Sequence, residues 1–212
     1  LEGSEPVSRM GQVRWYQKPK KGHIYVVGLD PSLGTGSDPA AIQVFDANTT
    51  TQVGEWKHNK TDIPSQIKLL AQINKYIAEC TGEPDSIYYS IENNSIGEAA
   101  LISLNEYGES NIPGIFLSET GKKRKGFNTT HKVKLTACAK FKTLLESKRM
   151  KVYSKSLISE LKTFVASGGS YQAKIGDTDD LVMASLLVVR MFQHLSDFHY
   201  NLEEDRKSTR LN

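Results

Sequence analysis

Three groups of acidic residues in this chain stand where carboxylates could meet. Asp30 directly follows the nearly continuous apolar run 23–29, and Glu92 follows a similar run, 86–91. The third group, Asp177-Thr178-Asp179-Asp180, precedes an apolar helical pattern. Carboxylates brought close together repel one another and raise each other's pKa, which has no structural benefit unless a cation neutralises them. The sequence therefore predicts a divalent-metal pocket built by two strand ends and one helix start.

The chemistry that suits such a pocket is metal-dependent phosphodiester hydrolysis. Mg²⁺ and Mn²⁺ take oxygen ligands and bind through a few carboxylates together with substrate phosphate oxygens. With two ions roughly 4 Å apart, one activates water and the other stabilises the leaving oxygen. We expect two ions, with Asp30 on the central strand as the ligand that bridges them.

Each acid also has an ordinary structural explanation. Asp30 could hold a turn with Pro31, and Glu92 could open the next helix. Asp177 and Asp179 suit a helix cap, because acids are favoured in the first helical turn. A helix cap explains Asp180 less well, because the other residues on the same face of the predicted helix are apolar.

The glycines at 34 and 36 do not form a nucleotide-binding motif. A strand pattern follows them where a dinucleotide fingerprint requires a helix, and the chain has no GxxxxGK[ST] sequence. We expect a hairpin here. Asp38 lies on its far side, where it either returns toward the pocket as an auxiliary acid or holds the turn.

Apolar periodicity places these acids in one α/β domain. The order is strand, strand, strand, helix, strand, helix, strand, and the first three strands form an antiparallel meander. The predicted segments are strands at 23–29, 40–45 and 52–56, a helix from 63 to about 82, a strand at 86–91, a helix at 95–107 and a strand at 112–117.

The second half of the chain adds helices and ends on the acidic cluster. We expect a helix at 130–147, a short strand at 150–153, a helix at 156–164, a hairpin at Gly168-Gly169 and a last long helix. Residues 1–21 are predicted to be a linker or tail, 22–200 the domain, and 201–212 a polar tail.

Composition limits the class of protein. The 212 residues carry a net charge of +3, which permits a polyanionic partner. Cys80 and Cys138 lack zinc-site spacing and indicate a reducing, intracellular compartment. The longest apolar run, 181–189, is too short to span a bilayer, and the first residues lack the apolar core of a signal peptide, so we expect no membrane partner.

A basic loop between two glycines predicts contact with DNA. Such a loop is usually only solvated, but here a helix with further lysines follows it, and contacts to phosphates give sequence-independent binding. The residues concerned are Lys122, Lys123, Arg124, Lys125, Lys132 and Lys134.

Several of these segments together resemble the C-terminal nuclease domain of the large terminase subunit of tailed, T-even-like bacteriophages. The resemblance rests on Gly-Leu-Asp-Pro-Ser at 28–32, Ile-Glu-Asn-Asn at 91–94, and Asp-Asp-Leu-Val-Met-Ala at 179–184 preceded by Glu-Leu-Lys-Thr-Phe at 160–164. It implies a ribonuclease H-like fold, with a central mixed sheet and helices on both faces. It also implies an endonuclease that cuts concatemeric double-stranded viral DNA in the cytoplasm of the infected bacterium.

The resemblance assigns metal-binding catalytic roles to Asp30, Glu92 and Asp180, with Asp38 and Asp179 as helpers. It implies an ATPase motor domain outside these residues, and contact with portal and small terminase subunits. Related members have a histidine where this chain has Thr178, which leaves open any proton-transfer role there.

Other functions remain to be distinguished at this stage. A structure-selective resolvase or a nuclease for RNA hybrids would use the same acids on different substrates. A non-catalytic DNA-binding or assembly module would tolerate Asp30→Asn and Asp180→Asn and ignore divalent metal. An actin-like ATPase would need glycine-rich phosphate loops in its second half, which this chain lacks.

Overall fold

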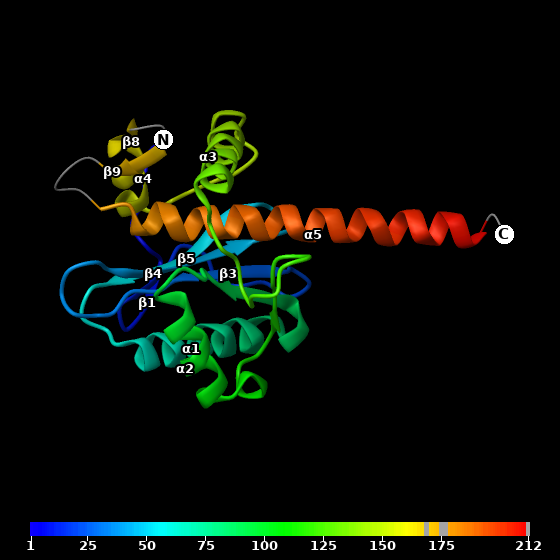
Figure 1. The fold of residues 1–212 in the computed structure, drawn as a ribbon, viewed down its shortest axis with the longest axis horizontal. Coiled ribbons are helices and arrows are strands. Elements are labelled where there is room, and N and C mark those ends of the chain that lie inside the picture. Colours follow the sequence, from blue (N-terminus) through cyan, green and yellow to red (C-terminus); the bar gives the residue numbers. More distant parts are fainter. Residues whose placement is uncertain (168–169, 174–177, 211–212) are drawn as a thin grey trace.

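A mixed β-sheet forms the centre of the protein, with helices on both faces (Figure 1). The structure is a computed structural model that describes residues 1–167, 170–173 and 178–210. In that part of the chain the main sheet has seven strands in the order β1-β2-β5-β4-β3-β6-β7. They are β1 Ser8–Met10, β2 Val13–Trp15, β3 Tyr25–Asp30, β4 Ala40–Asp46, β5 Thr51–His58, β6 Ile87–Ile91 and β7 Ile115–Phe116.

The helices separate into two layers. α1 and α2 cover one face of the sheet, whereas α5 lies across β3 and β4 on the other face, together with α3 and α4 (Figure 1). Their bounds are α1 Ile63–Thr81, α2 Gly97–Tyr107, α3 His131–Glu146, α4 Lys155–Thr163 and α5 Asp180–Arg210, with short 3-10 turns at Pro84–Ser86 and Glu109–Asn111. None of the described helices is long and apolar enough to cross a membrane.

The two-sided burial of β3 explains its nearly continuous apolar sequence. Val27 and Leu29 pack with α1 and α2, while Val26 packs with α5 on the opposite face. Gly28 also faces α5, and a Cβ atom there would lie 3.2 Å from side-chain carbons of Leu187 and Val188. The absence of a side chain at this position lets α5 approach the strand closely.

The predicted meander and crossover are confirmed. β3, β4 and β5 pair antiparallel in chain order, and β6 then pairs parallel to β3 after the crossover helix α1. Asp62 caps α1 by accepting a hydrogen bond from the backbone N–H of Ser65, and Gly82 ends the helix in the left-handed conformation.

The prediction of a linker for residues 1–21 is wrong for two segments. β1 and β2 extend the main sheet at the outer side of β5. Val13 and Trp15 are fully buried, and the Trp15 ring lies over Gly54 and against Tyr76. Three-residue strands are too short to show a period of two, so the pattern did not reveal them.

The predicted strand at 150–153 is also wrong. Lys151 makes only an isolated bridge to Thr51. The side chain of buried Gln52 takes the place of a strand partner, because its Oε1 accepts hydrogen bonds from the backbone N–H groups of Tyr153, at 2.9 Å, and Ser154, at 3.0 Å.

The chain near its end differs from the prediction in one respect. α5 continues to Arg210, beyond the domain end predicted near residue 200, and extends past the sheet (Figure 1). The predicted hairpin is confirmed by the antiparallel pairing of β8 Phe164–Ser167 with β9 Ser170–Ala173. Gly168, Gly169 and Asp177 lie outside the described residues.

Candidate metal centre

Parallel pairing brings Asp30 and Glu92 to the same end of the sheet. Asp30 is the last residue of β3, and Leu29 pairs with Ile91 of β6. The backbone N–H of Glu92 donates to the carbonyl of Leu29 at 2.9 Å, so Glu92 follows the end of β6 beside Asp30. Because parallel strands end at the same edge, the two carboxylates meet there, as predicted.

The start of α5 adds two more carboxylates to this end of the sheet, Asp180 as the first residue of the helix and Asp179 directly before it. Burial raises the pKa of Asp30 well above its usual value, and the charges of Glu92, Asp180 and Asp179 raise it further. Burial, followed by the charge of Asp179, raises the pKa of Asp180 to about 6, and exposed Asp38 adds a smaller effect. The structure therefore brings four predicted acids together, with Asp38 at the edge of the group.

Three basic side chains partly balance this negative charge. Lys57 of β5 acts on Asp180, Lys134 of α3 on Asp30, and Arg190 of α5 on Glu92, and each lowers the pKa of the carboxyl group it faces. Burial remains the larger effect in all three cases. The cluster consequently favours binding of a further positive charge.

The donor set suits a hard divalent cation, because it consists of carboxylate oxygens. Among the described residues, however, no group of three or more His, Cys, Asp or Glu side chains is arranged so that it could hold a metal ion. Ionised carboxylates repel at short range, so their closer approach requires a counter-charge. Each oxygen of Glu92 already accepts one hydrogen bond from Thr129.

Glu160 of α4 also belongs to this region, although the sequence motifs predict no role for it. Its Oε1 accepts hydrogen bonds from the backbone N–H groups of Leu181 and Val182 at 2.9 and 3.3 Å. Its Oε2 lies 3.0 Å from Nζ of Lys57, which also donates to Oγ1 of Thr178 at 2.7 Å. Glu160 thus joins α4 and β5 to the turn that carries Asp179 and Asp180.

The pKa of Glu160 is raised to about 7, because burial outweighs the opposing effect of Lys57. The sequence does contain a signal for this residue. Glu160 stands three positions after Leu157 on the buried side of an amphipathic helix, and an acid on such a face requires hydrogen-bond partners.

The basic loop lies next to Glu92. Phe127 forms a bridge with Glu92, and Nδ2 of Asn93 donates to the carbonyl of Lys125 at 2.8 Å. All four basic residues of 122–125 are exposed. Arg124 faces Glu98 at 3.9 Å and Lys125 pairs with Glu109, while Lys132 is exposed near the start of α3.

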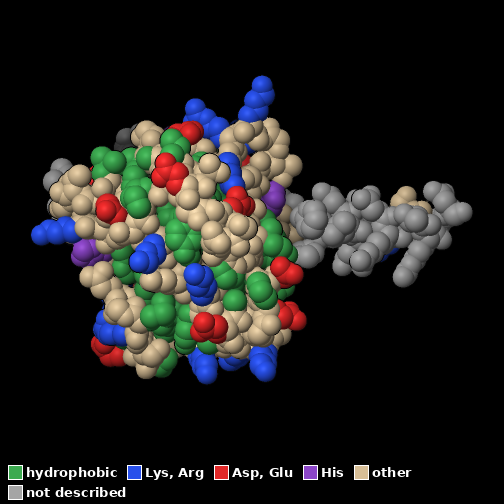
Figure 2. Space-filling view, turned by 90° about the horizontal axis from the view of Figure 1, so that it is seen from below, with side chains coloured by type: hydrophobic (Ala, Val, Ile, Leu, Met, Phe, Trp, Pro, Cys, Tyr) green, Lys and Arg blue, Asp and Glu red, His purple; other side chains and the backbone are tan. Residues whose placement is uncertain are grey.

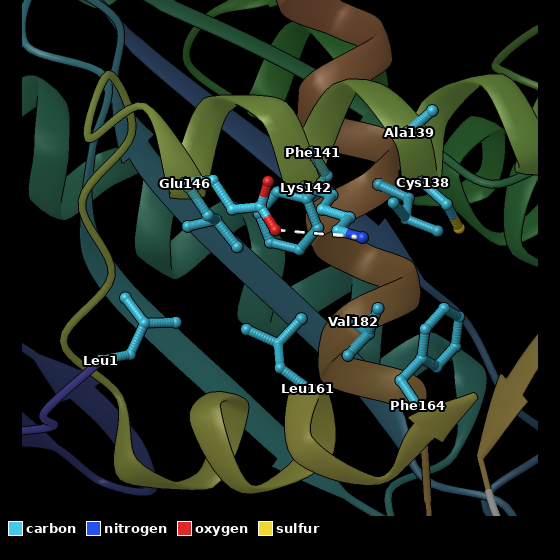
Figure 3. Close-up of a pocket in the computed structure, with 11 residues that line it drawn as sticks. Leu1, Cys138, Ala139, Phe141, Lys142, Glu146, Leu161, Phe164 and Val182 are labelled. Carbon is cyan, nitrogen blue, oxygen red and sulfur yellow. Dashed lines mark ion pairs between the residues drawn. The ribbon is translucent and has the colours of Figure 1, made fainter.

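Two other surfaces lie apart from the acids. Among the described residues, the face covered by α1 and α2 carries interspersed acidic and basic side chains and no continuous basic area (Figure 2). A cavity of 370 Å³ between α3, α4 and α5 is lined mainly by apolar side chains, including Phe141, Leu161 and Val182 (Figure 3). None of the predicted metal-binding acids lines this cavity.

A family model described as "Terminase RNaseH-like domain" matches residues 27–192. The chain belongs to this family. Its membership supports a nuclease role in DNA packaging, and it confirms the resemblance drawn from the motifs.

Solved structures of terminase nuclease domains share the fold. The nuclease of the large terminase from thermophilic phage G20c, with bound magnesium, is 20% identical with a TM-score of 0.68, over 89% of this chain and 92% of that chain. The nuclease domain of the large terminase of Thermus phage P74-26 is 21% identical with a TM-score of 0.63, over 88% and 89% of the two chains. The human cytomegalovirus terminase nuclease domain is 13% identical with a TM-score of 0.59, over 79% and 82%. The predicted ribonuclease H-like fold is therefore confirmed.

Proposed function

We propose that this domain is a metal-dependent DNA endonuclease that cuts concatemeric viral DNA during genome packaging. The observation that carries the proposal is the convergence of Asp30, Glu92, Asp179 and Asp180 from two parallel strands and one helix at a single end of the sheet. A partly buried group of like charges is costly unless a cation neutralises it, and metal-dependent DNA cleavage would use such a cation.

We propose that Asp30, Glu92 and Asp180 hold two divalent ions, with Asp179 and Asp38 as auxiliary ligands. Mg²⁺ or Mn²⁺ in this place would supply a nucleophilic hydroxide and stabilise the leaving oxygen. The solved G20c nuclease structures include forms with bound magnesium, cobalt and zinc, and the cytomegalovirus domain was soaked with manganese. These relatives support divalent metal as the cofactor of this chain.

The basic residues are proposed to hold double-stranded DNA beside the acids. Lys122 and Lys123 are exposed on the loop that runs past Glu92, and Lys132 is exposed on α3. Lys134 lies close enough to Asp30 to act on its pKa, which would place it near a phosphate at the cleavage point. Contacts to phosphates carry no sequence information, so we expect low sequence specificity.

The biological setting follows from the same family. We propose that the domain acts in the cytoplasm of the infected bacterium, beside an ATPase motor domain and in contact with portal and small terminase subunits. Terminase membership is the support for these partners.

Cleavage of supercoiled plasmid tests the proposal. The domain is incubated with Mg²⁺, Mn²⁺ or a chelator, beside Asp180→Asn and the matched control Asp85→Asn, whose side chain is exposed on the turn before β6. We expect metal-dependent nicking and linearisation that Asp180→Asn abolishes and Asp85→Asn retains. Retained DNA binding without cleavage under any metal would instead indicate a non-catalytic module. In a parallel assay with four-way junctions, preferential cleavage of the junction over plasmid would indicate a resolvase.

A further inference from the structure

The carboxylate of Glu92 is held at both oxygens by a single residue. Oε1 accepts a hydrogen bond from the backbone N–H of Thr129 at 2.7 Å, and Oε2 accepts one from its hydroxyl, Oγ1, at 2.8 Å. Glu92 is only 5% exposed, so few other orientations are open to it. A carboxylate has about four lone-pair positions. Thr129 therefore uses one position on each oxygen and leaves one on each for another ligand.

Arg190 fixes the direction of the Thr129 hydroxyl. Nη1 of Arg190 donates to Oγ1 of Thr129 at 3.0 Å. Because arginine is a donor only, the hydroxyl must accept from Arg190 and direct its own hydrogen to Glu92. Arg190 is itself held by an ion pair with Glu119 and by the ring of Phe127, whose centroid lies 5.2 Å from the guanidinium carbon.

This chain of contacts links the acids of the strand and the helix. Arg190 and Asp180 lie on the same helix, α5, so the element that carries Asp180 also fixes Glu92 through Thr129. In the chain, Thr129 follows the basic loop and directly precedes Thr130, the N-cap residue of α3. The contact network thus sets the position of Glu92 relative to α5.

We propose that Thr129 is a positioning residue for the metal site, oriented by Arg190, and that its hydroxyl holds Glu92 in the orientation that binds metal. The inference rests on the proposed metal-dependent function. Groups that hydrogen-bond to metal ligands orient those ligands, and their removal typically costs about 10- to 100-fold in metal affinity or activity.

The test compares Mn²⁺ binding by the DNA-free domain, measured by titration calorimetry, for wild type, Thr129→Val and Thr129→Ser. Valine keeps the shape and the backbone N–H but removes the hydroxyl, whereas serine keeps both donors. We expect Thr129→Val to weaken Mn²⁺ binding by about 10-fold or more and Thr129→Ser to restore it. Thr136→Val, at an exposed position of α3, is the matched control and should bind Mn²⁺ like wild type.

A cleavage assay gives a second, independent reading. For Thr129→Val, the Mg²⁺ concentration for half-maximal plasmid cleavage should rise while DNA affinity stays unchanged. If folded Thr129→Val binds Mn²⁺ as wild type does, the positioning role is refuted. If wild type itself binds no Mn²⁺, the proposed metal-dependent function fails instead. Should Thr129→Val not fold, Thr129→Ala removes the same hydroxyl without added bulk and is judged by the same criteria.

Discussion

Glu160→Ala removes a carboxylate that holds three donors at once. In the folded protein Glu160 accepts hydrogen bonds from the backbone of Leu181 and Val182 and pairs with Lys57 at 3.0 Å. Its side chain is 6% exposed, whereas that of Lys57 is 26% exposed. The substitution therefore leaves two N–H groups of α5 without their acceptor and one lysine without its buried partner.

The magnitude follows from these contacts. Removing the acceptor leaves two backbone N–H groups unpaired at about 1–3 kcal/mol each, and the cost of burying Glu160, whose pKa is raised to about 7, offsets part of that loss. We expect a loss of about 2–3 kcal/mol in the free energy of unfolding. For a domain of this size, about 2–4 °C per kcal/mol corresponds to a decrease in Tm of about 4–12 °C.

Urea unfolding and calorimetry measure the effect, with Glu5→Ala as the matched control. Glu5 pairs with Lys155 at 2.7 Å, a shorter distance than in the Lys57 pair, but both side chains are mostly exposed. Exposed pairs contribute little, so Glu5→Ala should unfold like wild type. If Glu160→Ala is also as stable as wild type, or if Glu5→Ala loses as much stability, burial is not what makes the Glu160 contact strong.

Two further predictions concern charge. The pKa of Asp180 rises from 3.8 to about 6 on folding, chiefly through burial. The folded state therefore binds the carboxyl proton of Asp180 more tightly than the unfolded state does. The contribution of Asp180 to the free energy of unfolding falls as the pH rises from about 4 to about 6. In chelator, Asp180→Asn should therefore have a higher Tm than wild type at pH 7.5, and this difference in Tm should be smaller at pH 5. Thermal unfolding at the two pH values measures the difference. An equal difference in Tm at both pH values would contradict the prediction. Replacing Lys122 and Lys123 by glutamine should weaken DNA binding and flatten its dependence on salt, with a slope change of about 0.9 for each lost phosphate contact. Fluorescence anisotropy at several salt concentrations measures the slope of DNA affinity against salt. The affinity for Mn²⁺ should stay unchanged. An unaltered slope would show that Lys122 and Lys123 do not contact DNA.

The meander and the positions of Asp30 and Glu92 could be predicted because they depend on local patterns. Strands buried on both faces have continuous apolar sequences, and each of these runs ends on an acid. The crossover helix α1 shows helical periodicity with a cap at each end. Together these features favour a parallel arrangement of β3 and β6, which the structure shows as neighbours.

Residues 8–15 and 150–153 were predicted incorrectly because their structure depends on distant partners. β2 pairs with β1 and with the edge of β5, where Gly54 leaves room for the Trp15 ring. Residues 153 and 154 bond instead to the side chain of Gln52, about one hundred positions earlier. A local pattern contains no record of such partners.

The sequence by itself determined which carboxylates end the central strands and open the last helix. Only the tertiary structure decided what holds them. Thr129 reaches Glu92 from a loop far along the chain and is itself held by Arg190 of α5, and Glu160 reaches the start of α5 from another helix. The physical reason is that an acid at a strand end is specified by its neighbours in sequence, whereas hydrogen-bond partners are specified by the packing of α3, α4 and α5 on the sheet.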